Sequence, residues 1–335
     1  MLDRRRFLTA SAAGVGALAL AACSDDSSAE GSGGSEASGA GSYTVGICQL
    51  TQHAALDEAT QGFQDKLAEL VEAEGGSVTF DLQNASGDSA TCTSIINGFV
   101  SAGVDLIMAN ATAALQAAQA GTSDIPILGT SVTDYGTALG MDDWSGTSGT
   151  NISGTCDLAP LDQQAAMVQE LFPDATNVGM LYCSAEPNSS YQIDAITPIL
   201  EEMGYTCTNY GFADSNDVAS VAQQAADASD VIYIPTDNTA ASCTEAIRNV
   251  VVPAGVPVVA GESGICSGCG VATLSISYYE LGEVTGEMGY DILVGGEDAG
   301  SMEVRSVEAT TKCYNPEVCE ELGIEPPEDY EALEA

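Results

Sequence analysis

The chain has 335 residues, of which 45% are hydrophobic, which is enough for a folded core in one large domain or two ordinary ones. It carries 49 Asp and Glu against 7 Lys and Arg, a formal net charge of −42, and a surface of this sign repels phosphate backbones and anionic lipids. The composition therefore argues against nucleic-acid binding and disfavours spontaneous adsorption to anionic lipid.

Residues 1–22 have the pattern of an export signal. Three arginines, Arg4 to Arg6, precede an apolar run of about 15 residues, which is short for a membrane span. The run ends in LAAC at Cys23, which resembles a bacterial lipobox, and residues 3–9 resemble a twin-arginine export motif. We therefore expect lipid on Cys23, a Gly/Ser-rich flexible tether over residues 23–42, and a protein held at the outer face of the cell membrane by its lipid alone.

The rest of the chain alternates predicted strands and helices in two series. The first has strands at 45–50, 78–82, 105–108 and 126–128, with helices between them that carry apolar residues at helical spacing. After residue 154 the alternation restarts with a helix at 161–171 and strands at 178–183, 205–211, 231–234 and 256–260. Repeated β-α-β units predict parallel sheets covered by helices, so two series predict two lobes.

The C-terminal part is expected to complete both lobes. It has strands at 272–277 and 304–311 and helices at 278–294 and 316–322. The predicted fold class is α/β, with two Rossmann-like lobes built on parallel sheets and joined by a three-segment hinge. Lobe 1 is expected to comprise 43–155 plus 270–300, lobe 2 to comprise 156–269 plus 301–324, and 325–335 to be an exposed acidic tail.

Polar residues follow most of the predicted strands, where ligands bind in parallel sheets. They include Gln52 and His53 after the first strand, Thr112, Thr133 and Asp134 in lobe 1, and Glu186, Asn188, Ser189, Asp237, Asn238 and Glu262 in lobe 2. Hydroxyls and helix N-termini suit a carboxylate, and buried acids suit an ammonium, so the pattern fits a zwitterionic amino acid. Capping of the following helices is an alternative role for each of these side chains.

Apart from Cys23 there are ten cysteines, an even number in a compartment where disulfides persist, so disulfides are expected. The pair Cys266 and Cys269 fits either a structural disulfide or a redox pair. With one histidine in the chain and no second CxxC, no metal site is expected, and no cofactor either.

Several segments, in order, resemble the substrate-binding lipoproteins of ABC importers of the tryptophan/tyrosine type. They include VGICQLTQHAALDEATQGFQDKLAE, NATAALQAA, IPILGTSVTD, NVGMLYCSAEPNSS and IPTDNTAAS, and the resemblance spans residues 43–300. It implies a type 1 periplasmic-binding-protein fold that closes on an amino acid and delivers it to an ABC permease and its ATPase. By position it places Thr112, Ala113, Thr133, Asp134, Asn188, Ser189, Asp237 and Asn238 in the ligand site, to which the strand ends add Gln52, Glu186 and Glu262.

An aromatic ligand needs an apolar wall, for which Tyr135, Trp144, Tyr191 and Tyr278 are candidates. We expect no enzyme, because the chain has neither a nucleophile elbow after a strand nor a phosphate-binding glycine loop with a lysine. Two other functions stay open: an envelope thiol oxidoreductase that uses Cys266 and Cys269, and a sensory ligand-binding module of the same fold.

Overall fold

The computed structural model describes residues 41–333. The expected signal peptide, Cys23 and the tether up to residue 40 therefore lie outside the described residues. Within 41–333, no helix combines the length and the apolar character that crossing a membrane requires.

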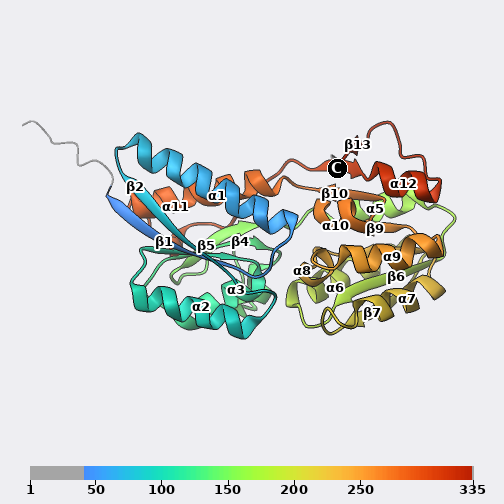
Figure 1. The fold of residues 1–335 in the computed structure, drawn as a ribbon, viewed down its shortest axis with the longest axis horizontal. Coiled ribbons are helices and arrows are strands. Elements are labelled where there is room, and N and C mark those ends of the chain that lie inside the picture. The colour runs from blue at the N-terminus through green and yellow to red at the C-terminus, as the bar shows by residue number, and fades with distance from the viewer. Residues whose placement is uncertain (1–40, 334–335) are drawn as a thin grey trace, which may run out of the picture. The chain divides into compact units, whose positions relative to one another are not determined.

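Lobe 1 is a six-stranded sheet in the order β11-β5-β4-β3-β1-β2, with all its strands parallel. Its strands are β1 (Ser42–Gln49), β2 (Ser77–Asn84), β3 (Leu106–Asn110), β4 (Ile127–Val132), β5 (Ile152–Cys156) and β11 (Arg305–Ser306). Its helices are α1 (Ala54–Ala73), α2 (Ser89–Ala102), α3 (Thr112–Gly121), α4 (Tyr135–Leu139) and α11 (Tyr278–Leu293), with a 3₁₀ turn at Ala299–Ser301. Figure 1 shows α1 and α11 on one face of this sheet and α2 and α3 on the other.

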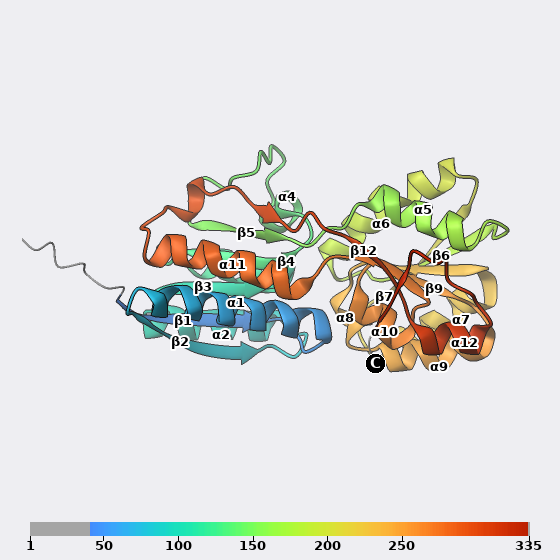
Figure 2. The ribbon, with the colours of Figure 1, turned by 90° about the horizontal axis from the view of Figure 1, so that it is seen from above.

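Lobe 2 is a seven-stranded sheet in the order β13-β12-β10-β9-β8-β6-β7, in which only the β10–β12 pair is antiparallel. Its strands are β6 (Asn177–Cys183), β7 (Thr206–Phe212), β8 (Val231–Ile234), β9 (Val258–Ala260), β10 (Ala272–Ser275), β12 (Thr311–Tyr314) and β13 (Glu331–Ala332). Its helices are α5 (Leu161–Leu171), α6 (Pro187–Glu202), α7 (Val218–Ala228), α8 (Asn238–Ala241), α9 (Thr244–Ala254), α10 (Ser263–Cys269) and α12 (Pro316–Leu322). Figure 2 shows α5 and α6 on one side of the sheet and α7 and α9 on the other.

Each sheet is buried on both faces, as parallel sheets require. In lobe 1 one apolar cluster packs under α2 and α3, around Ile96, Phe99 and Leu115, and a second packs under α1 and α11, around Phe63 and Met288. Helices α1 and α11 approach closely because Gly62 and Gly282 leave room for the partner backbone, and a Cβ at either position would meet a carbonyl oxygen. This close packing fixes α1 and α11 relative to each other on one face of the lobe 1 sheet.

The chain crosses between the lobes three times, which confirms the predicted hinge topology. The crossovers are 157–160 between β5 and α5, 276–277 between β10 and α11, and 307–310 between β11 and β12. Tyr278 at the start of α11 donates a hydrogen bond of 3.0 Å from its hydroxyl to Asp157, so the first two crossovers are tied together.

The predicted lobe boundaries at the crossovers are wrong in detail. Strand β10 was expected in lobe 1 as part of 270–300, but it pairs with β9 and β12 in lobe 2. Strand β11 was expected in lobe 2 as part of 301–324, but it pairs with β5. Residues 325–335 were expected to be an exposed tail, yet β13 pairs with β12 and Tyr330 is only 6% exposed, because its ring completes the lobe 2 core.

Candidate functional site

A cavity of about 230 Å³ lies between the carboxyl ends of the two sheets. Lobe 1 lines it with Leu50, Thr51, Ser86, Gly87, Ser89 and Ala113, and lobe 2 with Cys183, Ala185, Glu186, Ala213, Asp214, Ser215, Asn238, Thr239 and Ser242. The two sheets therefore share one crevice at the strand ends where parallel sheets bind ligands.

One hydrogen bond joins the lobes beside this cavity. His53, the residue before α1, lies with its Nε2 atom 3.3 Å from Oδ1 of Asn238 at the start of α8. Asn238 is in turn fixed by Glu186, which accepts from its backbone N–H at 3.1 Å and from Nδ2 at 2.7 Å. The bond therefore joins lobe 1 to lobe 2 through a residue, Asn238, that lines the cavity.

The helix N-termini that follow the strands fall into two kinds. Helices α4, α8 and α10 are capped by their own acids: Asp134 accepts from Thr137 N–H, Asp237 from Ala240 N–H, and Glu262 from Gly264 and Ile265 N–H. Helices α1, α3 and α6 have no side-chain cap among the described residues. Their free N–H groups carry partial positive charge, so they can bind a carboxylate.

The backbone is strained at two strand ends in lobe 1. Ala111, just before α3, has φ 88° and ψ 159°, and Ser131 near the end of β4 has φ 54°. Residues other than glycine rarely adopt these backbone conformations, and such strain is concentrated at binding sites. Ser131 also has a buried hydroxyl with no hydrogen-bond partner among the described residues.

Glu186 is held in place by five donors. Besides Asn238, it accepts from Thr239 N–H at 2.8 Å, from Thr239 Oγ1 at 2.7 Å and from Asn188 Nδ2 at 3.2 Å. Its carboxylate therefore serves as a second cap of α8 and orients Asn238 and Asn188 along the wall of the cavity.

Asp157, directly after β5, is a buried acid that caps no helix in the described structure. It is 3% exposed and accepts hydrogen bonds from Thr133 Oγ1 at 3.1 Å and from the Tyr278 hydroxyl at 3.0 Å. Burial raises its pKa to about 6. Burial likewise raises the pKa of Glu262 to about 7, and the negative charges of Asp157 and Glu58 act in the same direction, so these carboxyls lie near one another.

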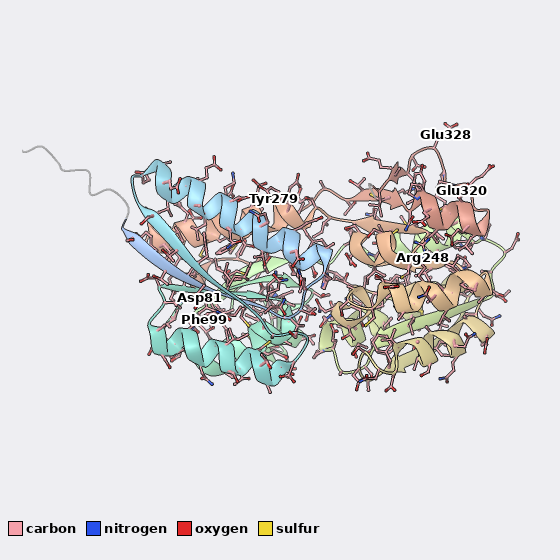
Figure 3. The ribbon with its side chains drawn as sticks, viewed as in Figure 1. Asp81, Phe99, Arg248, Tyr279, Glu320 and Glu328 are labelled. Atoms are coloured by element: carbon pink, nitrogen blue, oxygen red, sulfur yellow. The ribbon has the colours of Figure 1, made fainter. Side chains whose placement is uncertain are left out.

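No basic side chain of residues 41–333 neutralises these acids. Lys66, Arg248, Arg305 and Lys312 each pair with acids elsewhere. Figure 3 labels Arg248 on lobe 2, where it pairs with Glu317 and Glu321 of α12. An ammonium group brought by a ligand would supply the missing positive charge.

The expected site residues divide into groups. Ala113, Glu186 and Asn238 line the cavity, and Thr112, Asn188, Ser189 and Asp237 are buried next to it in the chain. Thr133 and Glu262 lie on the hinge side with Asp157. Gln52 is exposed in the loop before α1, and Asp134 borders a second hollow, together with Thr137 and Trp144.

Two of the four expected aromatic wall residues are part of the lobe 1 core. Tyr135 is buried, donates a hydrogen bond to the Thr155 carbonyl and stacks on Trp144 with ring centroids 5.7 Å apart, and neither residue lines the interlobe cavity. Tyr278 reaches the hinge side of the crevice. Tyr191 on α6 is half-buried, and its burial, together with the negative charge of Asp134, raises the pKa of its hydroxyl.

Sequence reasoning missed Asp157, and it left open whether the other acids cap helices or contact the ligand. The rule that picked out residues after strands applies equally to Asp157, but β5 was not predicted as a strand. Its sequence, ISGTC, contains one large β-branched residue and a glycine, which is a weak strand signal.

The ten cysteines of the described residues are all free thiols, so the expectation of disulfides is not met. Cys266 and Cys269 are fully buried, and burial raises the pKa of each thiol. A redox pair needs an accessible thiol with a lowered pKa, so the structure does not favour a thiol oxidoreductase.

Comparison with known proteins gives a consistent result. The family model described as ABC transporter substrate binding protein matches residues 44–333. A tyrosine-binding protein of Clostridioides difficile (strain R20291) is 32% identical over 97% of this chain and 94% of its own length.

Two solved structures are similar to this chain in fold as well as in sequence. An ABC domain in complex with L-Trp from Streptococcus pneumonia has a TM-score of 0.80 at 28% identity, covering 86% of this chain and all of that one. The ligand-free, open structure of a substrate-binding protein with adhesive properties from Clostridium difficile has a TM-score of 0.65 at 34% identity, covering 88% of this chain and 99% of that one. The two parallel-sheet lobes are those of a type 1 periplasmic-binding protein, and the chain belongs to the family of ABC transporter substrate-binding proteins.

Proposed function

We propose that this substrate-binding protein takes an aromatic amino acid, tyrosine or tryptophan, and delivers it to an ABC permease and its ATPase. The names of the similar proteins support this ligand class, because one is a tyrosine-binding protein and another is solved with L-Trp. The observation that carries the proposal is a crevice that combines buried acids and uncapped helix N-termini without a basic side chain in the described part of the chain.

The two charged groups of an amino acid match the two kinds of polar wall. The N–H groups of Thr112 and Ala113 at the start of α3 supply donors for the carboxylate, and no side chain in the described part of the chain caps α3. Asp157, which caps no helix among the described residues, supplies the negative charge for the ammonium, and the charge of Glu262, which caps α10, lies close to it. An anion without an ammonium group would be repelled, and this gives selectivity for zwitterions.

Closure of the lobes completes the site. The structure superposes better on the L-Trp complex than on the ligand-free, open relative, although the latter is more similar in sequence. The bond between His53 and Asn238 exists only when the lobes are in contact. A ligand that touches both walls therefore shifts the population towards the closed form that the permease recognises.

The proposed location is the outer face of the cell membrane, with the protein anchored through lipid on Cys23. Mass spectrometry of the protein purified from membranes tests this: the expected mature chain begins at Cys23 and carries acyl groups. An unmodified chain that still retains residues 1–22 would contradict it.

Calorimetric titration tests the ligand. L-tyrosine or L-tryptophan is expected to bind, whereas tyramine, which lacks the carboxylate, and N-acetyl-L-tyrosine, which lacks the ammonium, should each bind at least about tenfold more weakly. If neither amino acid binds, the proposed ligand class is wrong. If tyramine binds as tightly as tyrosine, the proposed carboxylate site at α3 is wrong.

A further inference from the structure

The protonation of His53 can be assigned from its neighbour. The Asn238 side chain donates from Nδ2 to Glu186 at 2.7 Å, so its Oδ1 atom is an acceptor. The Nε2 atom of His53, 3.3 Å from that oxygen, must therefore carry a proton and donate it. Burial lowers the pKa of His53, against the hydrogen bond to Asn238 and the charges of Glu186 and Asp57, which favours the neutral ring with its proton on Nε2.

This tautomer leaves Nδ1 as a lone-pair acceptor. The atom is buried and has no hydrogen-bond partner among the described residues. Buried acceptors are costly to leave unpaired, so a donor is expected when the site is filled. His53 does not itself line the interlobe cavity, but its hydrogen-bond partner Asn238 and Thr51, two residues before it, both do.

The bound ligand can supply this donor. Because Nδ1 is a neutral acceptor, it limits which group of the ligand can be the donor. In the proposed function, the ligand ammonium faces Asp157 and Glu262 and its carboxylate faces the start of α3. The neutral Nδ1 atom then suits a neutral N–H or O–H on the ligand side chain.

We infer that His53 Nδ1 accepts a hydrogen bond from the side-chain hydroxyl of tyrosine or the indole N–H of tryptophan, so that His53 selects these ligands over phenylalanine. This inference rests on the proposed function. Phenylalanine would fill the same space but leave the buried acceptor unpaired, and sites that hydrogen-bond a substrate O–H or N–H strongly reject an analogue without it. The His53 side chain would thus both join the two lobes and discriminate between ligands.

The test is the ratio of dissociation constants for phenylalanine and tyrosine, measured by calorimetry. The wild-type protein should bind tyrosine at least about tenfold more tightly than phenylalanine. The variant His53→Phe keeps a planar ring but has no nitrogen, and its ratio should fall close to one. Loss of the bond to Asn238 would weaken both ligands equally, so it cannot change the ratio.

Two further variants complete the test. Asn238→Ala removes the interlobe bond but keeps the histidine, so it should weaken both ligands and preserve the ratio. His53→Gln offers a donor and an acceptor and should partly restore the ratio that His53→Phe loses. If His53→Phe folds poorly by circular dichroism, the ratio measured for the wild-type protein still tests the inference.

The inference alone is overturned if folded His53→Phe keeps the wild-type ratio, or if the wild-type protein binds phenylalanine as tightly as tyrosine. Absence of binding to both tyrosine and tryptophan would overturn the proposed function as well. The two failures are therefore distinguishable.

Discussion

Asp157 is buried, accepts from two hydroxyl donors and has no positive partner among residues 41–333, so its charge is destabilising until a ligand arrives. We predict that Asp157→Asn weakens tyrosine or tryptophan binding at least about tenfold. The same change should stabilise the ligand-free protein by about 1–3 kcal/mol near neutral pH, because the raised pKa means that ionisation of Asp157 opposes folding. Calorimetry measures the first effect and urea unfolding the second.

Asp134 provides the control for Asp157. Its carboxylate caps α4 by accepting from Thr137 N–H at 2.7 Å, so Asp134→Ala should cost about 1 kcal/mol of stability and leave ligand affinity unchanged. Equal losses of affinity in the two variants would contradict the assignment, as would an Asp157→Asn protein that binds normally.

The buried acids also make stability and binding depend on pH in opposite directions. The pKa values of Asp157, Glu262 and Asp237 are raised to about 6, 7 and 7, above the ordinary values of 3.8, 4.5 and 3.8, with burial as the largest cause. The native state therefore holds more protons than the unfolded state between about pH 4 and 7, and the free energy of unfolding falls as pH rises through this window.

The ligand ammonium needs the ionised carboxyls, so affinity should rise over the same window. Thermal unfolding with and without tyrosine, from about pH 5 to pH 8 in high salt that screens the surface charge, measures both trends. A ligand-free melting temperature that rises with pH would contradict the prediction.

Residue identity alone predicted where the polar side chains gather, but not what each one does. An acid that follows a strand and begins a helix fits either a ligand contact or an N-cap. In the structure Asp237 accepts from both Cys183 N–H and Ala240 N–H, so both of its oxygens are already used. Only the hydrogen bonds in the structure distinguish acids that cap a helix, such as Asp237, from Asp157, which caps none in the described residues.

At the scale of elements, the periodicity of the sequence predicted α11 at 278–294 and the structure places it at Tyr278–Leu293. The lobe to which a strand belongs was harder to predict. All four residues of β10 are buried, so neither face of this strand meets solvent. The sequence therefore does not indicate in which of the two sheets β10 lies. Strand β11 has only two residues, and its place is set by pairing with β5.

The junction of β3 and α3 gives a prediction about stored strain. Ala111 holds φ 88° and ψ 159°, a conformation that is open to glycine and costs other residues about 1–3 kcal/mol. We predict that Ala111→Gly raises the free energy of unfolding by about 1 kcal/mol, measured by urea denaturation. Ala109→Gly, in the preceding strand with ordinary backbone angles, is the control and should destabilise the protein. A loss of stability in Ala111→Gly equal to that of the control would contradict the strain.

At the scale of the whole molecule, the formal charge of −42 sets the response to salt. Seven ion pairs involve the four basic residues of the described chain, and they are mostly exposed pairs that contribute little each. Repulsion among the many remaining acids therefore outweighs the attraction that salt would screen.

We predict that the melting temperature of the ligand-free protein rises when NaCl increases from about 0.1 M to about 1 M, because the Debye length shortens from about 10 Å to about 3 Å. The buried acids of the crevice are screened far less than the surface. Asp157→Asn should therefore show the same rise as the wild type, displaced to higher temperature at every salt concentration. A melting temperature that falls with salt would mean that the seven ion pairs outweigh the repulsion.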